Sequence, residues 1–365
     1  MLRALSSNLF LAMLTLVGLG IVQVYSSSYI FAFENYGDGL FFLKKQILFT
    51  IVGFVAFFVA FKIRLEWFEK LSWVMWVVSA SLVALTLIPG VGVRVGGAIR
   101  WIQLPFGFRF EPGEMLKMSL IFFLSTLLFS EKNWISQRSL AARFVLFAAP
   151  FGMLLKQPDF GSFMILFVTT VSLLFLSGLS WKWIAGGAAV SLPAFYFLVM
   201  RVDYRRARIA AFLDPWSDPE RKGFQVIQSM LSFHSGGATG AGLGNGQGKL
   251  FFLPEAHTDF TLAVFGEELG FIGLVILMSL YAYIVFRIFQ IGILTKSAFY
   301  KSICIGGGVL FGLNFLINAG VTMGLFPTKG LTMPFLSYGG SSLVVFMFLF
   351  GVLVNIEKNT ERSLN

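Results

Sequence analysis

The sequence predicts an all-α polytopic membrane protein with about ten transmembrane helices, and three observations lead to this fold class. The 365 residues are 57% hydrophobic and only 13% charged, whereas soluble domains carry about 25% charged residues. Mean hydropathy is +0.80. Apolar runs of roughly 20 residues, the length that crosses a bilayer as a helix, recur from end to end. We therefore expect residues 1–365 to form a single integral membrane domain.

The expected spans follow one another with mostly short connections. The first run resembles a signal peptide, but equal runs follow it, and we interpret it as an uncleaved span. Segments 143–157 and 159–178 form either a tight hairpin or one broken helix, and Pro158 favours the break. The expected spans are 8–28, 42–61, 71–88, 114–130, 143–157, 159–178, 181–200, 259–287, 299–323 and 337–356.

One connection, residues 201–258 between the seventh and eighth spans, is too long for a simple link. Its start mixes arginines with apolar positions, a pattern typical of a short amphipathic helix at a membrane surface. An even number of spans puts both termini on one side. The short loops on that side carry more lysine and arginine, so we expect both termini to be cytoplasmic and the long loop extracytoplasmic.

Charge and cysteine content exclude several function classes. A net charge of +10 in a membrane protein reflects cytoplasmic loops and sites for anionic lipid heads, and we expect no nucleic-acid partner. The single cysteine, Cys304, excludes a disulfide framework. Because the chain has only two histidines, a zinc site is not expected, and we predict no resident metal.

Asp259 stands where the long loop meets a hydrophobic helix. If that helix includes Asp259, then Ala263, Gly266, Gly270 and Gly273 fall within roughly 40° of it. This pattern predicts a carboxylate at the membrane boundary above a small-residue groove for a lipid tail. The alternative is an acid at a helix N-terminus and small residues that allow close helix packing.

The spacing of acids on this helix favours a transferase over a hydrolase. Asp259 and Glu267 would lie about 12 Å apart along a helix, beyond the roughly 6.5–9.5 Å between the carboxyl groups of inverting glycoside hydrolases. A lone carboxylate suits a reaction whose acceptor is a hydroxyl and whose leaving group is a diphosphate neutralised by cations. For Glu267 and Glu268 we expect hydrogen bonds between helices.

Basic residues are unusually frequent on the predicted outer side. Glu114 and Lys117, three residues apart at a span entrance, are expected to pair. The glycine-rich run 236–248 lacks the P-loop pattern and is either a flexible loop or a backbone that approaches a phosphate. Irregular segment 325–342 is expected to face a cavity. The predicted basic rim for one or two diphosphates comprises Arg100, Lys117, Arg205, Arg208, Lys249 and Lys329.

Taken together, several stretches resemble the SEDS family, which includes the FtsW, RodA and SpoVE proteins of bacterial cell-wall synthesis. The resemblance implies about ten helices and polymerisation of lipid II into glycan strands at the outer face of the cytoplasmic membrane. It also implies a class B penicillin-binding protein and other division membrane proteins as partners. The stretches are GAIRWIQL, RARIAAFLDPWSDP, GFQVIQS, GLGNGQGKLFFLPEAHTDF, GEELGFIG and TKGLTMPFLSYGGSS.

By this resemblance, Asp259 is the general base that takes the proton of the acceptor 4-hydroxyl, and a diphosphate leaves the donor sugar. No cofactor is certain, and a divalent cation is compatible. One departure is EPGE at 111–114, where the family commonly has QPSE. The expected substrate-binding residues are Arg100, Glu114, Lys117, Arg205, Arg208, Lys249, His257, Thr258, Lys329, Ser341 and Ser342.

Other functions stay open at this point. A lipid II flippase needs no general base, and a division scaffold needs no chemistry, so both should tolerate Asp259→Asn better than a polymerase does. Within the family, Trp216, Gln225, Lys249 and Ala256 resemble the division type (FtsW) more than the elongation type (RodA). The sporulation type (SpoVE) shares much of this pattern.

Overall fold

The computed structural model describes residues 7–95, 98–129, 140–182, 185–186, 189, 203–220, 223–249 and 253–364. Most of the expected span 181–200 lies outside these residues, so the predicted total of ten spans stays a prediction. Within the described part of the chain, seven helices are long and apolar enough to cross a membrane. They are α2 (Asn8–Tyr36), α3 (Phe41–Lys62), α4 (Leu65–Thr86), α5 (Pro112–Phe129), α11 (Thr261–Leu294), α12 (Ala298–Thr322) and α13 (Gly340–Leu364).

Two shorter apolar helices, α6 (Leu140–Lys156) and α7 (Phe160–Leu176), match the two segments around Pro158. The chain interrupts the helix at Pro158 as predicted, and the two helices pack against each other, so the segments form the hairpin that the sequence left open rather than one broken helix. Asp159 is the N-cap of α7, and its side chain accepts a hydrogen bond from the Ser162 backbone N–H at 3.2 Å. Gln157 is buried and donates to Thr86 at the end of α4, which ties the hairpin to this neighbouring helix.

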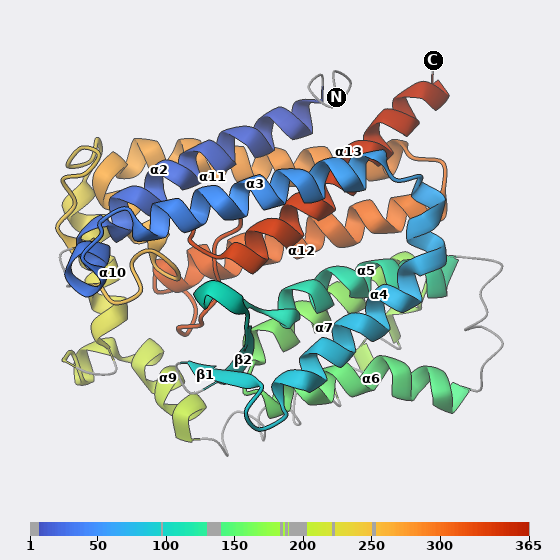
Figure 1. Ribbon diagram of the computed structural model, residues 1–365, viewed down its shortest axis with the longest axis horizontal. Helices are drawn as coiled ribbons and strands as arrows, with labels where there is room; N and C mark the ends of the chain where they lie inside the picture. The colour runs from blue at the N-terminus through green and yellow to red at the C-terminus, as the bar shows by residue number, and fades with distance from the viewer. Residues whose placement is uncertain are drawn as a thin grey trace.

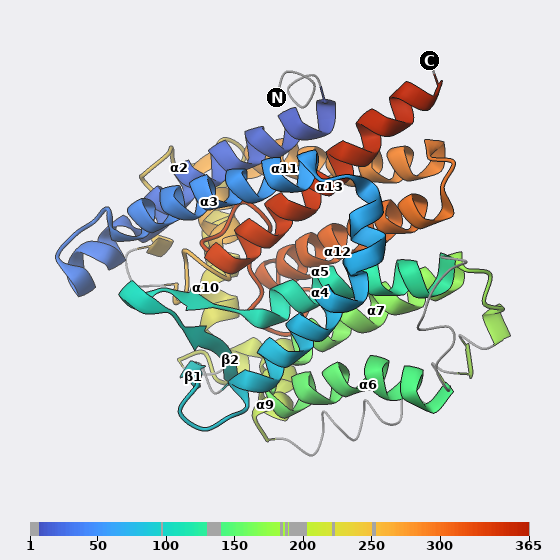
Figure 2. The same cartoon turned by 45° about the vertical axis from the view of Figure 1, so that its right-hand side comes forward.

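The helices form two groups in Figures 1 and 2. In one group α3 packs on α13 and α11 on both α12 and α2; in the other, α4 packs on α5 and α5 on α7. Phenylalanines fill the first core, with Phe57, Phe311 and Phe346 fully or almost fully buried. Trp76 stacks on Phe123 in the second core. Both termini lie toward one end of the helices, and α9, α10 and the strands lie toward the other (Figure 1).

A three-stranded antiparallel sheet departs from the all-α prediction. It comprises β1 (Gly92–Val95), β2 (Ala98–Gln103) and β3 (Arg109–Phe110), in the order β1-β2-β3. β-Branched and aromatic residues in GVRV and AIRWIQ favour strands, and β2 is buried at Ala98, half-buried from Ile99 to Ile102 and exposed at Gln103. The sheet precedes α5 directly and carries Arg100, so it brings a cation to the end of the helix bundle.

The long loop contains regular structure of its own. The arginine-rich start forms α9 (Asp203–Leu213), as the sequence predicts, followed by a 3₁₀ turn (Pro215–Ser217) and α10 (Phe224–Gly236). In α9, Ala211 is buried and Arg206 is exposed. Helix α10 packs along α11, so the loop is held against the membrane-crossing helices.

The predicted groove beside Asp259 is wrong. Helix α11 begins at Thr261, after Asp259, and Gly270 interrupts it with φ 66° and ψ −169°. A side chain on Gly266 would collide with the ring of Phe233, and one on Gly270 with the backbone at Gly240. The small residues therefore allow α10 and the glycine-rich run to pack closely, which is the alternative that the sequence left open.

The glycine-rich run is fastened to this interruption, and its backbone N–H groups serve the protein itself. Backbone N–H groups of Ala241 and Gly242 donate to the carbonyls of Glu267 and Glu268 at 2.9 and 3.0 Å. The Glu267 carboxylate accepts the N–H of Gln247 at 2.7 Å and that of Gly248 at 3.0 Å. The prediction of interhelical bonding is therefore wrong for Glu267. It is confirmed for Glu268, which accepts from Ser26 of α2 at 2.5 Å.

Candidate active site

A cavity of about 880 Å³ opens where α5, α11 and α13 begin and α12 ends. Successive membrane-crossing helices run in opposite directions, so the start of α11, the end of α12 and the start of α13 lie on the same side of the bundle. Residues of β2 and α9 line the cavity on this side as well. Predicted site residues line it from six segments far apart in sequence. They are Arg100, Glu114, Arg208, Thr258, Asp259, Lys329, Ser341 and Ser342.

The backbone of Asp259 is held in a tight turn rather than in a helix. Glu255 has a left-handed backbone with φ 55°, and its carbonyl accepts the N–H groups of Thr258 and Asp259 at 3.1 Å and that of Phe260 at 3.3 Å. From α12, the Asn318 side chain donates to the Asp259 carbonyl at 2.9 Å. These bonds fix the segment that carries the carboxylate and leave the carboxylate itself facing the cavity.

The surroundings of Asp259 bring its pKa close to neutral pH. Burial, and secondarily the negative charge of Glu255, raise the pKa of Asp259 to about 7, while Arg100 and Arg208 pull it down. A general base works best when its pKa is close to the working pH. Burial is therefore the main physical cause that brings the pKa of the Asp259 carboxyl close to neutral pH.

Gly330 keeps a space open beside the carboxylate. A Cβ atom at this position would lie 3.3 Å from Asp259 Oδ2 and 3.7 Å from Arg100 Nη1. The same point is therefore within reach of the carboxylate and of a guanidinium. A hydroxyl placed there could give its proton to Asp259 while a neighbouring anionic group meets Arg100.

Three residues of the predicted rim, Arg100, Arg208 and Lys329, line the cavity from three separate segments, together with Lys45 and Arg109, which the sequence analysis did not assign. Arg100 Nη2 lies 3.6 Å from Asp159 Oδ1, and Arg208 Nη1 donates to the Thr328 carbonyl at 2.7 Å. The Lys329 ammonium stands 5.1 Å from the centroid of the Phe160 ring, and burial lowers its pKa. Asp159 neutralises part of this charge, and carboxylates line the same cavity, so its wall carries charged groups of both signs.

The predicted pair of Glu114 and Lys117 is confirmed, with Lys117 Nζ 2.7 Å from Glu114 Oε1. The Lys117 side chain is 1% exposed and also donates to Asn314 Oδ1 at 3.5 Å. Glu114 lines the cavity, but Lys117 does not. Lys117 thus lies beneath the rim that the sequence predicted it to join, and it acts on the cavity through Glu114.

The cavity contains carboxylates that the sequence analysis did not assign. Glu111 and Glu255 line it, and Asp159 faces Arg100. Burial, then the charges of Glu114 and Asp159, raise the pKa of Glu111 to about 8. The signal for Glu111 was visible, since EPGE departs from the family's common QPSE at this residue.

Ser341 has a definite contact at the cavity wall. Its Oγ accepts the Glu111 backbone N–H at 3.0 Å, which joins the start of α5 to the start of α13. The buried Ser342 lies beside it on the same wall. The two serines therefore line the cavity, as segment 325–342 was expected to do.

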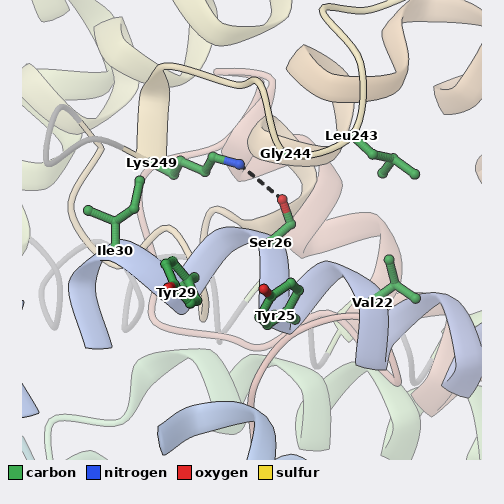
Figure 3. Close-up of a pocket in the computed structure, with 8 residues that line it drawn as sticks. All are labelled: Val22, Tyr25, Ser26, Tyr29, Ile30, Leu243, Gly244 and Lys249. Carbon is green, nitrogen blue, oxygen red and sulfur yellow. Dashed lines mark hydrogen bonds between the residues drawn. The ribbon is translucent and has the colours of Figure 1, made fainter. Parts of the chain in front are cut away.

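Lys249 lies apart from this cavity. Its ammonium is 2.7 Å from Glu268 Oε1 and 3.1 Å from Ser26 Oγ. It lines a second cavity of about 330 Å³ against α2, walled by Tyr25 and Tyr29 (Figure 3). Because its charge is matched by a buried carboxylate, Lys249 does not join the predicted rim.

His257 is another predicted residue that stays out of the cavity lining. His257 is buried, with its ring centroid 4.5 Å from that of Phe42, and burial lowers its pKa. Its carbonyl accepts the Tyr338 N–H at 2.9 Å, so it joins the base-carrying turn to the segment before α13. The side chain of Arg205 is outside the described residues.

A divalent cation finds no ready ligand set in the described structure. Among those residues, no three histidine, cysteine, aspartate or glutamate side chains are grouped to hold a metal ion. Two carboxylates at the cavity pair with cations instead, Asp159 with Arg100 and Glu114 with Lys117.

Apolar membrane-crossing helices that gather a carboxylate and several cations in one cavity define an integral membrane protein with a polar site at the helix ends. The sequence profile of the family described as "Cell cycle protein", which unites FtsW, RodA and SpoVE, matches residues 7–362. The chain belongs to this family, known as SEDS, and the resemblance found in the sequence is confirmed.

Individual relatives agree over nearly the whole chain. A protein of Trichlorobacter lovleyi named "Probable peptidoglycan glycosyltransferase FtsW" is 43% identical over 95% of this chain and 92% of its own length. A Geobacter metallireducens protein of the same name is 41% identical, over 92% and 90%. A solved structure described as "Structural coordination of polymerization and crosslinking by a peptidoglycan synthase complex" aligns with TM-score 0.79 and 28% identity, over 97% of both chains.

The fold is shared with a further structure. The rod shape determining protein RodA of Thermus thermophilus aligns with a TM-score of 0.70 and 24% identity over 96% of both chains. The predicted fold class, a helical membrane protein of this family, is therefore confirmed.

Proposed function

We propose that this protein is a peptidoglycan glycosyltransferase that polymerises lipid II at the outer face of the bacterial cytoplasmic membrane, with Asp259 as general base. The observation that carries the proposal is the position of Asp259 in a cavity that also contains Arg100, Arg208 and Lys329. The names of relatives that are about 40% identical along nearly the whole chain support the same activity.

In the proposed reaction, the acceptor 4-hydroxyl occupies the space that Gly330 leaves beside Asp259. Asp259 accepts its proton as the oxygen attacks C1 of the donor sugar from the face opposite the leaving group. The bond between C1 and the diphosphate oxygen breaks, and the lipid diphosphate departs with the electron pair. Arg100, Arg208 and Lys329 stabilise the negative charge that develops on it.

The lipid portion of the substrates fits the place of the cavity. The cavity lies at the ends of membrane-crossing helices, so a polar head can enter it while the tail stays in the bilayer. The excess of lysine and arginine in the short loops of the opposite side supports cytoplasmic termini and an outward-facing site.

The decisive experiment uses the full-length protein in proteoliposomes with purified lipid II, and resolves products by chain length. Glycan strands of several disaccharides would support the proposal. If lipid II crosses the bilayer without being joined, the protein is a flippase; if it neither moves nor reacts with the partner present, a scaffold role gains support.

Polymerisation should depend on pH through Asp259, because only the ionised carboxylate can accept a proton. With a pKa of about 7, kcat/KM should rise as the pH increases through about 7 and fall on the acid side. Glu111, whose pKa is about 8, provides the control, since its charge is not among those that shift the pKa of Asp259. Glu111→Gln should keep the midpoint, and a midpoint that disappears in this variant would assign it to Glu111.

We also propose a class B penicillin-binding protein as the partner, with a single span that packs on α11. This helix exposes large apolar side chains at Phe271, Ile276 and Phe286. The chain also aligns with a chain of the solved structure described as a peptidoglycan synthase complex. By docking on the long loop as well, the partner would favour its active arrangement. The protein alone should then show low activity in the same assay, and full activity alone would count against this regulation.

The division role rests on the FtsW-like residues of the long loop and on the names of the relatives. Depletion from cells of the source bacterium should produce filaments with unsplit septa. Round cells that still divide would instead indicate the elongation role, and a defect confined to spores would indicate the sporulation role.

A further inference from the structure

Polar residues recur at every fourth position on α12, namely Asn314, Asn318 and Thr322. This spacing places them on one face of the helix, and all three are buried. Asn314 and Thr322 donate to carbonyls of their own helix, Leu310 in one case and Asn318 and Ala319 in the other. The Asn318 side chain differs, because both of its bonds leave the helix.

The two hydrogen bonds of Asn318 join the turn that carries Asp259 to the 329–331 segment of the cavity wall. Its Nδ2 donates to the Asp259 carbonyl at 2.9 Å and to the Leu331 carbonyl at 2.6 Å. Asp259 ends the turn that carries the base, and Leu331 directly follows Lys329 and Gly330 of the cavity wall. One rigid helix thus sets the separation between the proton acceptor and the wall segment.

The chemistry of the site calls for a double donor here. Two backbone carbonyls converge on a side chain that is 2% exposed, and a buried carbonyl without a partner is costly. A primary amide offers two N–H groups from one nitrogen. Its oxygen, Asn318 Oδ1, has no partner among the described residues, so the donor side supplies the polar contacts that the structure gives this side chain.

We infer that Asn318 is a positioning residue, which holds the Asp259 turn and the 329–331 segment at the separation that the transfer reaction needs. This inference rests on the proposed glycosyltransferase function and deepens it. Asn318 does not line the cavity and touches no substrate. It acts through the backbone of Asp259, and a displacement of about 1 Å in such a site can reduce the rate by about 10²-fold.

The effect should be visible in the titration of Asp259, independently of activity. The charged groups that surround this carboxylate are Glu255 of its own turn, Arg100 of β2, Arg208 of α9 and the nearby Lys329. When the two hydrogen bonds of Asn318 are lost, the turn that carries Asp259 loosens and water reaches the carboxylate. Asp259 should then titrate at lower pH, because its burial is what raises its midpoint.

The test compares wild-type protein with Asn318→Leu, in which no donor remains, and Asn318→Ser, in which one donor remains. Isotope-edited infrared spectroscopy of full-length protein labelled with ¹³C-aspartate, with the Asp259→Asn spectrum subtracted, follows the Asp259 carboxylate. Polymerisation of lipid II is measured on the same samples. Thr322→Val is the matched control, because it removes a buried hydroxyl one turn away whose bonds stay on α12.

For Asn318→Leu we expect an Asp259 midpoint moved to lower pH and a kcat reduced by about 10²-fold. Asn318→Ser should move both in the same direction by less, and it serves alone if the leucine variant does not fold. Thr322→Val should keep the wild-type midpoint. An unmoved midpoint in a folded Asn318 variant would overturn the inference. If the midpoint moves but the wild-type protein does not polymerise lipid II, Asn318 positions the Asp259 turn and the proposed function is refuted.

Discussion

Asp259→Asn should abolish polymerisation of lipid II while leaving the fold intact. The amide has the shape of the carboxylate but cannot accept the acceptor's proton, and general bases typically contribute about 10²–10⁴-fold in rate. The bonds that fix this turn involve the backbone of Asp259 and survive the change. The measurement is the rate of glycan formation by purified protein, with lipid II binding determined separately.

Asp38→Asn is a matched control for this change. Asp38 is a partly exposed carboxylate whose Oδ2 lies 2.7 Å from Lys44 Nζ, in a connection between α2 and α3. Its loss should leave polymerisation unchanged. If Asp259→Asn polymerises lipid II near the wild-type rate, the base lies elsewhere, and Glu255 and Glu111 in the same cavity become the groups to test.

Lys117→Met should destabilise the protein strongly, because it leaves the carboxylate of Glu114 buried without its cation. Removing one partner of a buried ion pair typically costs about 3–5 kcal/mol. The Lys117 side chain is 1% exposed and that of Glu114 is 7% exposed, so the carboxylate would lose its cation where little solvent reaches it. Thermal unfolding in detergent should show a markedly lower Tm.

A double variant separates charge from packing. Glu114→Gln combined with Lys117→Met removes both charges and should recover most of the lost stability, because no unpaired charge remains buried. Lys44→Met, which breaks the exposed pair with Asp38, should leave the Tm nearly unchanged, since exposed ion pairs contribute little. If Lys117→Met unfolds at the wild-type temperature, the pair has no role in stability.

Hydropathy alone predicted the described membrane-crossing helices, because a bilayer requires long apolar helices whose backbone groups are satisfied internally. Each of these helices lies on an expected span. The break at Pro158 and the pair Glu114–Lys117 were also predictable, because each depends only on residues within one helical turn. Asp259 stood out because a carboxylate at the boundary of a span is costly unless it has a role.

The direction of the Asp259 turn depends on contacts that no local pattern contains. The sequence suggested a helix with Asp259 on a small-residue face, but α11 begins at Thr261 and breaks at Gly270. The cause is competition for backbone hydrogen bonds, since the glycine-rich run supplies partners to both sides of the break. Such bonds form only when the loop is folded against the helix.

The membrane-spanning class, the family motifs and the position of Asp259 at the boundary of a span therefore followed from the sequence, because each depends on local composition or on spacing along the chain. Tertiary structure decided which charges share the cavity. Lys249 was expected there, yet it pairs with Glu268 and with Ser26, 223 residues away. Asn318 passed unnoticed as one more polar residue in a helix, because its function lies in two carbonyls that meet it only after the helices have packed.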